Sequence, residues 1–436
     1  MLDIKWIREN GERLQTIADQ KGMEVSINEL LEWDGQKRSL LQQIEPLRQA
    51  RNKMSQDINL LMQTGNMEKA DQCKQTVKEL NGELARLEAE LAGAEQAFKK
   101  LMLRVPNIVS PDTPVGRSDA DNVEIRRVGF PIRFDFVPRD HVALGELHNM
   151  IDIPRGVKTA GSRNYYLKGA GVMLHRAVQQ LALDLLMHKG FLPLEVPLMA
   201  RAEALTGTGF FPLGEDQVYA VPEEERWLVG TSEVPLVSYY SNETVDVTEP
   251  IKLAAASTCF RNEVGSASKD VHGLYRVHQF SKVEQVILCE ASLDRSEELL
   301  REITGNAEEL LQLLKLPYRV MSVCTGDMSQ KTYKQFDIES WMPSRDSYGE
   351  THSSSSLLDF QARRSNIRYR DAQGKPHYCY TLNNTAVASP RILIPLLENH
   401  QEEDGSIWIP PALRPYMNGM ERLVPPGGPV HNALSV

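Results

Sequence analysis

The sequence predicts an α+β protein in which an N-terminal antiparallel helical hairpin precedes a larger domain built on an antiparallel β-sheet flanked by helices. Three observations predict it. Apolar residues between positions 30 and 103 recur at alternating spacings of three and four, which is the seam of a coiled coil. Residues 105–123 carry three prolines among several Asp and Ser residues, which is typical of a linker. Beyond them, strand-like runs and helices do not alternate regularly, which favours an antiparallel sheet.

The predicted hairpin consists of two heptad helices of about 30 residues each, joined near Thr64-Gly65-Asn66. Each helix would extend roughly 45 Å. Lys37 and Arg51 occupy two seam positions, and Pro46 should remove a backbone hydrogen bond and bend the first helix. Basic and acidic residues are interleaved, so the charge pattern alone fits a dimerisation strut or a spacer with a solvated surface.

The composition narrows the class of protein. The 436 residues, 41% hydrophobic and 25% charged, exclude a mostly disordered chain and suggest two or three domains. A formal charge of −10 argues against a protein that coats nucleic acid non-specifically, although it allows a local basic face. Five scattered cysteines without CxxC spacing indicate free thiols in a reducing compartment rather than a zinc site. Without a signal peptide or a long apolar run, we expect a cytoplasmic protein with no membrane contact.

In the larger domain, the pattern predicts strands over 251–260 and 283–289 and amphipathic helices over 172–189 and 295–314. The Pro/Gly-rich end is expected to be a flexible tail. The predicted boundaries are therefore an N-terminal domain at 1–104 with its hairpin at about 30–103, a linker at 105–123, a main domain at 124–423 and a tail at 424–436.

A predicted hairpin over 257–284 carries the first candidate functional residues. An apolar strand is followed by a Gly/Ser/Asp-rich loop, and a second strand is expected to begin at Tyr275. We expect Arg261 and Glu284 to lie on adjacent strands and to face the same side of the sheet. A guanidinium there suits a phosphate, because its planar fork donates two parallel charge-assisted bonds, and Phe280 offers a stacking face for a base. A cross-strand salt bridge on a surface hairpin remains the alternative.

This hairpin resembles motif 2 of class II aminoacyl-tRNA synthetases, in the version found in bacterial seryl-tRNA synthetases. Other segments are similar to the same family in the same order: Pro197 at the motif 1 proline, Thr206-Gly207-Thr208-Gly209 at the TGTG segment, Gly230-Thr231-Ser232-Glu233-Val234-Pro235 at the TAE loop, Tyr348 to Arg364 at the Glu-x-x-Ser segment with its QARR, and Asn383 to Glu398 at a motif 3 variant with Pro-Arg. The hairpin at 30–103 is similar to the tRNA-binding arm. The resemblance covers nearly the whole chain.

The resemblance implies a class II catalytic domain and a serine–tRNA ligase. Such an enzyme activates L-serine with ATP to seryl-adenylate, releases pyrophosphate, and transfers serine to the 3′ end of tRNA(Ser), with tRNA(Sec) as a further candidate acceptor. It also implies ATP and Mg²⁺ as cofactors, tRNA binding through the helical arm, and a homodimer. No general base is needed, because the attacking serine carboxylate is ionised at neutral pH.

The family's site residues carry over onto matching positions. The resemblance implies ATP contacts from Arg261, Asn262, Glu263, Val277, Phe280, Glu350, Thr351, His352, Ser353 and Arg391. It implies serine contacts from Thr231, Ser232, Glu233, Arg261, Glu284, Asn383 and Thr385. Glu350 and Ser353 would hold Mg²⁺ through ATP, and Arg261, Glu350 and Arg391 would be the catalytic residues. Arg261 would hold both reacting anions together, which supplies orientation and charge stabilisation at once.

Five positions depart from the family pattern: Ser232, Asn262, His272, Gly349 and Ser354. The family usually has Arg at positions 272 and 349, so we expect altered handling of the polyphosphate and of the tRNA acceptor end. Two alternatives stay open. One is a paralogue that activates serine or an analogue for a non-tRNA acceptor, which the intact arm disfavours. The other is a non-catalytic tRNA-binding or dimer-partner paralogue, which the retained charged residues disfavour.

Overall fold

The computed structural model describes residues 1–264 and 272–426, and the chain forms two compact units. The helical unit consists of residues 3–19 and 23–105. The sheet unit consists of residues 1–2 and 20–22 and of the chain from Pro106 onward. Each unit is described by itself.

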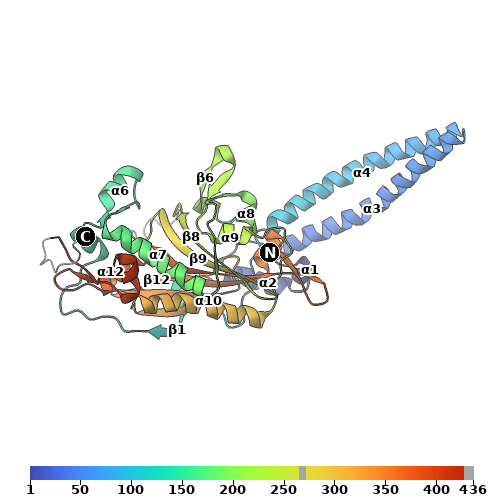
Figure 1. Cartoon of the computed structure of the whole chain (residues 1–436). Coiled ribbons are helices and arrows are strands. Elements are labelled where there is room, and N and C mark those ends of the chain that lie inside the picture. The colour runs from blue at the N-terminus through green and yellow to red at the C-terminus, as the bar shows by residue number, and fades with distance from the viewer. Residues whose placement is uncertain (265–271, 427–436) are drawn as a thin grey trace. The chain divides into compact units, whose positions relative to one another are not determined.

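The helical unit is dominated by two long helices that run side by side in opposite directions (Figure 1). Its helices are α1 (Ile4–Glu9), α2 (Gly11–Gln20), α3 (Ile27–Gln63) and α4 (Met67–Met102). The Ser26 hydroxyl caps α3 by accepting a bond from the backbone N–H of Glu29. The turn uses Gly65 at φ +74°, where glycine is free of the Cβ clash. These elements confirm the predicted hairpin.

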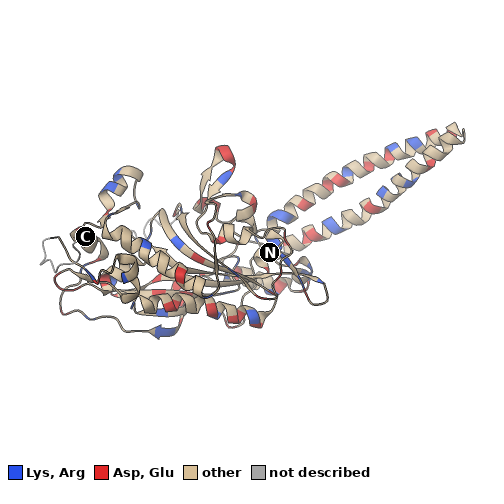
Figure 2. Cartoon of the chain, in the orientation of Figure 1, with Lys and Arg blue, Asp and Glu red and all other residues tan. Residues whose placement is uncertain are grey.

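The hairpin is held together by the predicted seam. Ile44 of α3 packs against Leu84, Leu87 and Leu91 of α4. Lys37, which occupies a seam position of α3, is accommodated because its ammonium lies 4.3 Å from the ring centre of Phe98 in α4. Charges of both signs alternate along both helices (Figure 2). α3 continues through Pro46 as one helix, so the missing hydrogen bond does not end it.

The sheet unit contains an eight-stranded sheet with the order β1-β10-β11-β12-β15-β9-β8-β4. Its strands are β1 (Val123–Val128), β4 (Leu192–Pro193), β8 (Ile251–Phe260), β9 (Gln279–Cys289), β10 (Tyr318–Ser322), β11 (Lys334–Met342), β12 (Ser347–Leu358) and β15 (Tyr380–Ser389). All neighbours pair antiparallel except β4 and β8, which are parallel. The predicted α+β class is therefore confirmed, with one parallel pair at the edge of the sheet.

The predicted start of the second strand at Tyr275 is wrong, because β9 begins at Gln279. The backbone before it bonds outside the sheet instead. The N–H of Leu274 donates to a histidine side chain, and the N–H of His278 donates to the carbonyl of Arg163. Gly273 takes φ +64°, which turns the chain away from a strand. The segment 273–278 is therefore irregular, and the pairing with β8 begins where Gln279 lies opposite Phe260 and Phe280 opposite Cys259.

Helices cover the two faces of the sheet unequally. α7 (Ala170–His188), α10 (Leu293–Leu313) and α12 (Leu393–Asn399) share one hydrophobic core with alternate residues of the strands, Val283 and Ile287 of β9 among them. On the other face, α9 (Glu233–Ser238) and α11 (Phe360–Ser365) pack over Val286 and Leu288. Within residues 1–264 and 272–426, the helices of this core do not pack over the stretch of β9 from Phe280 to Glu284 on that second face.

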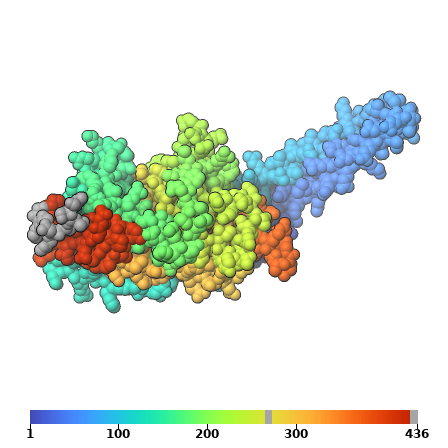
Figure 3. Space-filling model, in the orientation of Figure 1, coloured from blue at the N-terminus to red at the C-terminus, as the bar shows by residue number. Residues whose placement is uncertain are grey.

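Smaller elements complete the unit. They are α5 (His141–Leu147), α6 (Ile153–Ala160), α8 (Ala202–Gly207), and the short strands β2 (Ile151–Asp152), β3 (Tyr166–Leu167), β5 (Met199–Arg201), β6 (Tyr219–Val221), β7 (Arg226–Leu228), β13 (Arg368–Arg370), β14 (Pro376–Tyr378), β16 (Ile407–Trp408) and β17 (Arg422–Leu423). The regions around α6 and around β6 stand out from the sheet unit in the space-filling view (Figure 3). Among the described residues, no helix combines the length and the apolarity that crossing a bilayer requires.

His175 makes the stability of the sheet unit sensitive to acid. Its Nδ1 bonds to the Ser389 hydroxyl at 2.8 Å, and burial, helped by Arg176, lowers the pKa of His175 from 6.5 to about 4. The unfolded chain takes up a proton near pH 6.5 that the folded chain resists until about pH 4. Acidification through this window therefore favours unfolding, and His175→Gln should reduce the loss of unfolding free energy between pH 7 and pH 5 by about 1–2 kcal/mol.

Urea unfolding at both pH values measures this difference. His188→Gln, at the exposed end of the same helix, is the matched control and should keep the wild-type loss. Equal losses for His175→Gln and the wild type would contradict the prediction.

Candidate active site

A cavity lies over the part of the sheet that no helix covers. It is lined by residues from β9, β12 and β15, from the segment that directly follows β8, and from the segments that flank these strands. The predicted residues that line it are Arg261, Glu263, Val277, Phe280, Glu350, Thr351, His352, Thr385 and Arg391. The hairpin, the Glu-x-x-Ser segment and the motif 3 segment, which are far apart in the sequence, therefore converge on one site.

Arg261 lies directly after β8 and reaches over the floor of the cavity. Its guanidinium carbon lies 5.2 Å from the ring centre of Phe280, and its Nε donates to the carbonyl of Gly230 at 3.3 Å. Its backbone N–H donates to the carbonyl of His278 at 2.9 Å, which fixes the residue although it is outside the strand. An arginine beside an aromatic ring offers two neighbouring surfaces, one for an anion and one for a flat base.

Tyr275 was missed as a site residue by the sequence analysis, which treated it as the start of a strand. The guanidinium carbons of Arg391 and Arg345 lie 4.5 and 4.2 Å from its ring centre. Arg391 also donates from Nε to the Tyr275 carbonyl at 3.1 Å and from Nη1 to the Glu350 carbonyl at 3.2 Å. The Tyr275 hydroxyl donates to the same Glu350 carbonyl at 3.2 Å. We call Tyr275, Arg345 and Arg391 the arginine–tyrosine wall; Tyr275 and Arg391 line the cavity, whereas Arg345 packs on the Tyr275 ring without lining it.

Glu284 and Thr385 form a polar pair at the other end of the floor. They face each other across β9 and β15, and the Thr385 hydroxyl lies 3.4 Å from the Glu284 carboxylate. Lys282, two residues earlier on the same strand face, pairs with Glu284 at 2.5 Å. Burial raises the pKa of Glu284, while Lys282 opposes that change by favouring the ionised carboxylate. Lys282 was not predicted, and it also lines the cavity.

Glu233 stands close enough to Glu284 to raise its pKa further. Its own carboxylate is buried and accepts bonds from the Lys331 ammonium at 2.5 Å and from the Gln361 amide at 2.6 Å. Gln361 also donates to the carbonyl of Thr208 at 2.9 Å, which links the TGTG segment to this pair. Lys331 and Gln361 were missed. Gln361 belongs to the QARR that the sequence analysis noted, whereas nothing near Lys331 in the sequence indicated it.

The turn that carries Lys331 is fixed from two sides within the sheet unit. The buried Lys21 ammonium donates to the carbonyl of Thr332 at 2.6 Å, and the Asn107 amide donates to the carbonyl of Lys331 at 3.0 Å. Burial lowers the pKa of Lys21 to about 7. These bonds hold the backbone at Lys331 and at the residue that follows it, so the fold fixes the point from which the Lys331 side chain extends.

The remaining predicted residues, Glu233 and Glu284 among them, do not line the cavity. Thr231 and Ser232 are buried just before α9, where the Thr231 hydroxyl accepts a bond from the N–H of Glu233. The Asn262 amide donates to the carbonyl of Asp216. In the strand register, Ser353 lies opposite Asp337 of β11, and Asn383 lies opposite Ser355 of β12. Of the residues that line the cavity, Thr351 and His352 bond each other through Oγ1 and Nδ1 at 2.8 Å.

The oxygen donors near Glu350 fit a Mg²⁺ ion. The Glu350 side chain is 49% exposed at the cavity, and Ser353 follows three residues later on β12. Burial, together with the nearby Glu350 charge, raises the pKa of Asp337 to about 8, and the Ser353 hydroxyl bonds to Asp337. Hard cations prefer such oxygen ligands. The described residues contain no cluster of three metal-binding side chains, so an ion here would need further oxygens from a phosphate.

The departures from the family pattern have different structural settings. A Cβ at Gly349 would lie 2.9 Å from Met342 and 3.2 Å from Tyr275, so a larger side chain requires its neighbours to shift. His272 is exposed and pairs with Asp140 at 2.9 Å. Ser354 accepts a bond from Asn384 and does not line the cavity, so its replacement leaves the cavity untouched. The loop predicted between the strands lies mostly at 265–271, outside the described residues.

Comparison with known proteins identifies the family. Residues 219–400 match the tRNA synthetase class II core domain (G, H, P, S and T), and residues 1–109 match the seryl-tRNA synthetase N-terminal domain. The chain is 44% identical over 427 residues to the serine–tRNA ligase of Deinococcus radiodurans, which covers 98% of this chain and 100% of the relative. The chain belongs to the seryl-tRNA synthetase family. The serine–tRNA ligase of Rubrobacter xylanophilus is 40% identical over 419 residues, with 96% and 98% covered.

Solved structures of family members agree over the whole chain. The seryl-tRNA synthetase of Pyrococcus horikoshii, complexed with ATP, superposes with a TM-score of 0.89 at 38% identity and covers 98% of this chain and 100% of its own. The cytoplasmic serine–tRNA ligase of Naegleria fowleri, in complex with AMP, gives 0.85 at 26% identity with 98% and 99% covered. The predicted fold, a long helix pair followed by a class II catalytic domain, is thereby confirmed.

The Lys331–Glu233 pair should be important for stability because Glu233 is buried and the Lys331 side chain is only 13% exposed. Lys331→Met leaves the Glu233 carboxylate without its cation and should lower the free energy of unfolding by about 3 kcal/mol. Lys189→Met breaks a more exposed pair with Glu309 and is the control, with an expected loss of at most about 1 kcal/mol. Urea denaturation measures both. Equal losses for the two variants would show that burial of the Glu233 pair has no energetic consequence.

Proposed function

We propose that the cavity of this serine–tRNA ligase binds L-serine and ATP side by side and joins them as seryl-adenylate. The observation that carries the proposal is that Arg261 and Phe280 line the cavity together, while Glu284 follows Phe280 on the same strand and has Glu233 close to it, just beyond the cavity lining. Phe280 and Glu284 share one strand face and are four residues apart, which corresponds to roughly 13 Å. An adenylate needs such a span between its base and its amino acid.

The residues divide between the two substrates. Phe280 and Val277 receive the adenine, and Arg391 lies along the nucleotide with Glu263, Asn262, Thr351 and His352 around it. Glu233 and Thr231, with Ser232 beside them, receive the serine ammonium. Glu284 and Thr385 bond the serine hydroxyl, Asn383 lies next to them, and Arg261 holds the carboxylate. The ATP-bound relative from Pyrococcus horikoshii supports the nucleotide half of this assignment.

The first step is an in-line displacement. A carboxylate oxygen of serine forms a bond to the α-phosphorus, and the bond from that phosphorus to the bridging oxygen breaks as pyrophosphate leaves with the electron pair. Arg261 and Arg391 stabilise the negative charge that collects on the phosphate oxygens. Mg²⁺ held by Glu350 and Ser353 through ATP would neutralise charge on the pyrophosphate. In the second step, a hydroxyl at the 3′ end of tRNA(Ser) attacks the carbonyl carbon and AMP leaves.

Discrimination against alanine follows from the polar pair at Glu284 and Thr385. An amino acid without a hydroxyl would leave these buried groups unsatisfied, and sites of this kind reject such analogues by about 10⁴–10⁵-fold. Threonine carries the hydroxyl and has to be rejected by lack of space for its methyl group.

The hairpin and an edge of the sheet are the surfaces that we assign to the macromolecular partners. The α3–α4 hairpin within the tRNA-binding domain (1–104) receives tRNA(Ser), with tRNA(Sec) as a further candidate. The chain works as a cytoplasmic homodimer through its catalytic domain (124–423). Support for the dimer comes from β1, an edge strand whose Val123 and Ile125 are exposed, and from Phe130 and Val137 beyond it, at 88% and 89% exposure. Large exposed apolar side chains near an open sheet edge suit burial against a second copy.

The role of Arg261 is tested by Arg261→Lys in serine-dependent exchange of pyrophosphate into ATP. Lysine keeps the charge but cannot hold two anions with one planar fork, so the exchange rate should fall by about 100-fold or more. Arg226→Lys changes an exposed arginine of β7 in the same way and should leave the rate unchanged. Retention of the rate by Arg261→Lys would overturn the proposed reaction in this cavity.

The role of the hairpin is tested by shortening it. Arg48 and Glu88 pair across α3 and α4 at 2.7 Å, so removing residues 49–87 and joining the ends with a short glycine linker shortens both helices evenly. Serine-dependent pyrophosphate exchange should persist, whereas charging of tRNA(Ser) should fall by about 100-fold, because long-range phosphate contacts are lost. Undiminished charging by the shortened protein would rule out the arm as the tRNA-binding element.

A further inference from the structure

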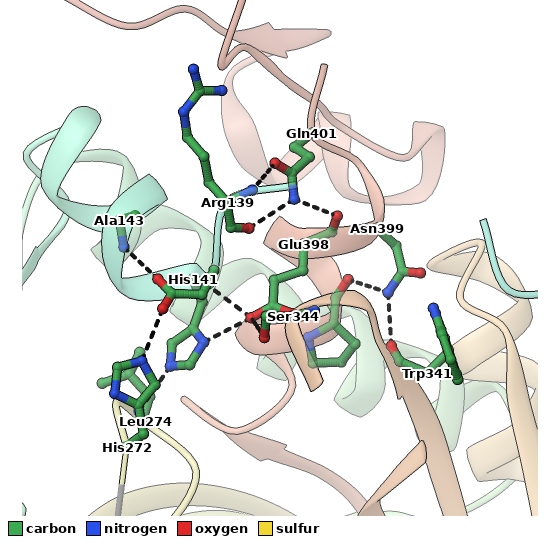
Figure 4. A network of polar contacts seen from close by, with 12 residues as sticks. Arg139, His141, Ala143, His272, Leu274, Trp341, Ser344, Glu398, Asn399 and Gln401 are labelled. Carbon is green, nitrogen blue, oxygen red and sulfur yellow. Dashed lines mark hydrogen bonds and ion pairs between the residues drawn. The ribbon is translucent and has the colours of Figure 1, made fainter. Parts of the chain in front are cut away.

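A buried carboxylate behind the cavity links the segments that form the arginine–tyrosine wall. Glu398 lies on α12 and is completely buried. It accepts bonds from the N–H and Nδ1 of His141, at 3.0 and 2.9 Å, and from the N–H and Oγ of Ser344, at 3.0 and 2.9 Å (Figure 4). Neither Glu398 nor His141 lines the cavity, so the reaction as described does not use them.

The contacts of His141 determine its tautomer. Nε2 accepts the backbone N–H of Leu274 at 3.1 Å, so it cannot carry a proton itself. Nδ1 must then carry the proton and donate it to Glu398. The imidazole therefore acts as a neutral bridge from the buried carboxylate to the backbone of the cavity lining (Figure 4). The approach is close enough that a Cβ on Gly273 would collide with Nε2.

Each partner of Glu398 adjoins one member of the arginine–tyrosine wall. Leu274, held through His141, precedes Tyr275. Ser344 precedes Arg345, which lies over the Tyr275 ring. Glu398 itself belongs to the helix that starts just after Arg391. One carboxylate thus fixes three separate segments relative to each other at the point where they meet around Tyr275.

We propose that Glu398 and His141 are positioning residues for ATP: they hold Tyr275, with Arg345 on its ring, so that Arg391 keeps its place at the nucleotide end of the cavity. The inference rests on the proposed function, since it assumes that ATP binds there. The serine end is built from other contacts, through Lys282, Lys331 and Gln361. Loss of the Glu398 bridge should therefore weaken ATP binding selectively.

Glu398→Gln is the most direct test. The amide keeps the shape of the carboxylate, but its NH₂ group cannot accept. Because Oε1 accepts three of the four bonds, the amide oxygen takes that position, and the NH₂ group then opposes the backbone N–H of Ser344 that donates to Oε2. In serine-dependent pyrophosphate exchange, the KM for ATP should rise about 10-fold, while the KM for serine stays within about 2-fold.

Two further variants and one control make the test decisive. Ser344→Ala removes one donor and keeps the His141 bridge, and it should raise the KM for ATP by about 3-fold. His141→Gln should behave like Glu398→Gln. His400→Gln is the control, because His400 is a buried histidine two residues after Glu398 whose Nε2 bonds to the carbonyl of Leu314 at 2.8 Å, away from the cavity. Both KM values should be unchanged in that control.

Thermal unfolding of each variant separates misfolding from mispositioning. If Glu398→Gln does not fold, the milder Ser344→Ala and His141→Gln decide the question. A joint rise of both KM values, or no rise for ATP in variants that fold, overturns the positioning role. That failure differs from failure of the proposed function, in which Arg261→Lys would keep the exchange rate.

Discussion

The active site depends on one stretch of sheet that carries no helix. Because side chains alternate along β9, Phe280, Lys282 and Glu284 face one side while Val283 and Ile287 face the core with α7, α10 and α12. On the open side, α9 and α11 stop over Val286 and Leu288. A short run of one strand therefore presents an aromatic ring and a cation to the cavity and pairs that cation with an anion on the same face, over a packed hydrophobic core.

Placing charges on such a floor requires that they be paired. Glu284 and Glu233 are both buried and close together, which alone would favour protonation of one of them. Lys282 and Lys331 each supply a cation at 2.5 Å, and Gln361 adds a hydrogen bond. The acidic end of the pocket is thus kept polar by groups that must be present together, and the fixed turn around Lys331 shows that their geometry is built into the fold.

Patterns of neighbouring residues predicted the elements that depend on neighbouring residues. The three-four spacing gave the hairpin, and the apolar run 251–260 gave β8, because periodicity and burial decide these elements. The order of motifs predicted the residues that converge on the cavity. Periodicity could not predict that β9 starts at Gln279, since bonds from distant residues hold the preceding segment outside the sheet. The role of Lys331 could not be predicted for the same reason, because its partner Glu233 is 98 positions away in the sequence.

The irregular backbone of the arginine–tyrosine wall explains why a buried Glu398 is needed. A strand would turn alternate side chains away from the cavity, whereas the irregular segment lets Leu274, Tyr275 and Val277 all line it. The consequence is that backbone N–H groups there lose the sheet ladder, and a buried donor without an acceptor destabilises the fold. Glu398 accepts bonds from the N–H groups of His141 and Ser344. Nε2 of the His141 ring accepts the bond from the N–H of Leu274. The same bonds that satisfy the backbone therefore fix the wall.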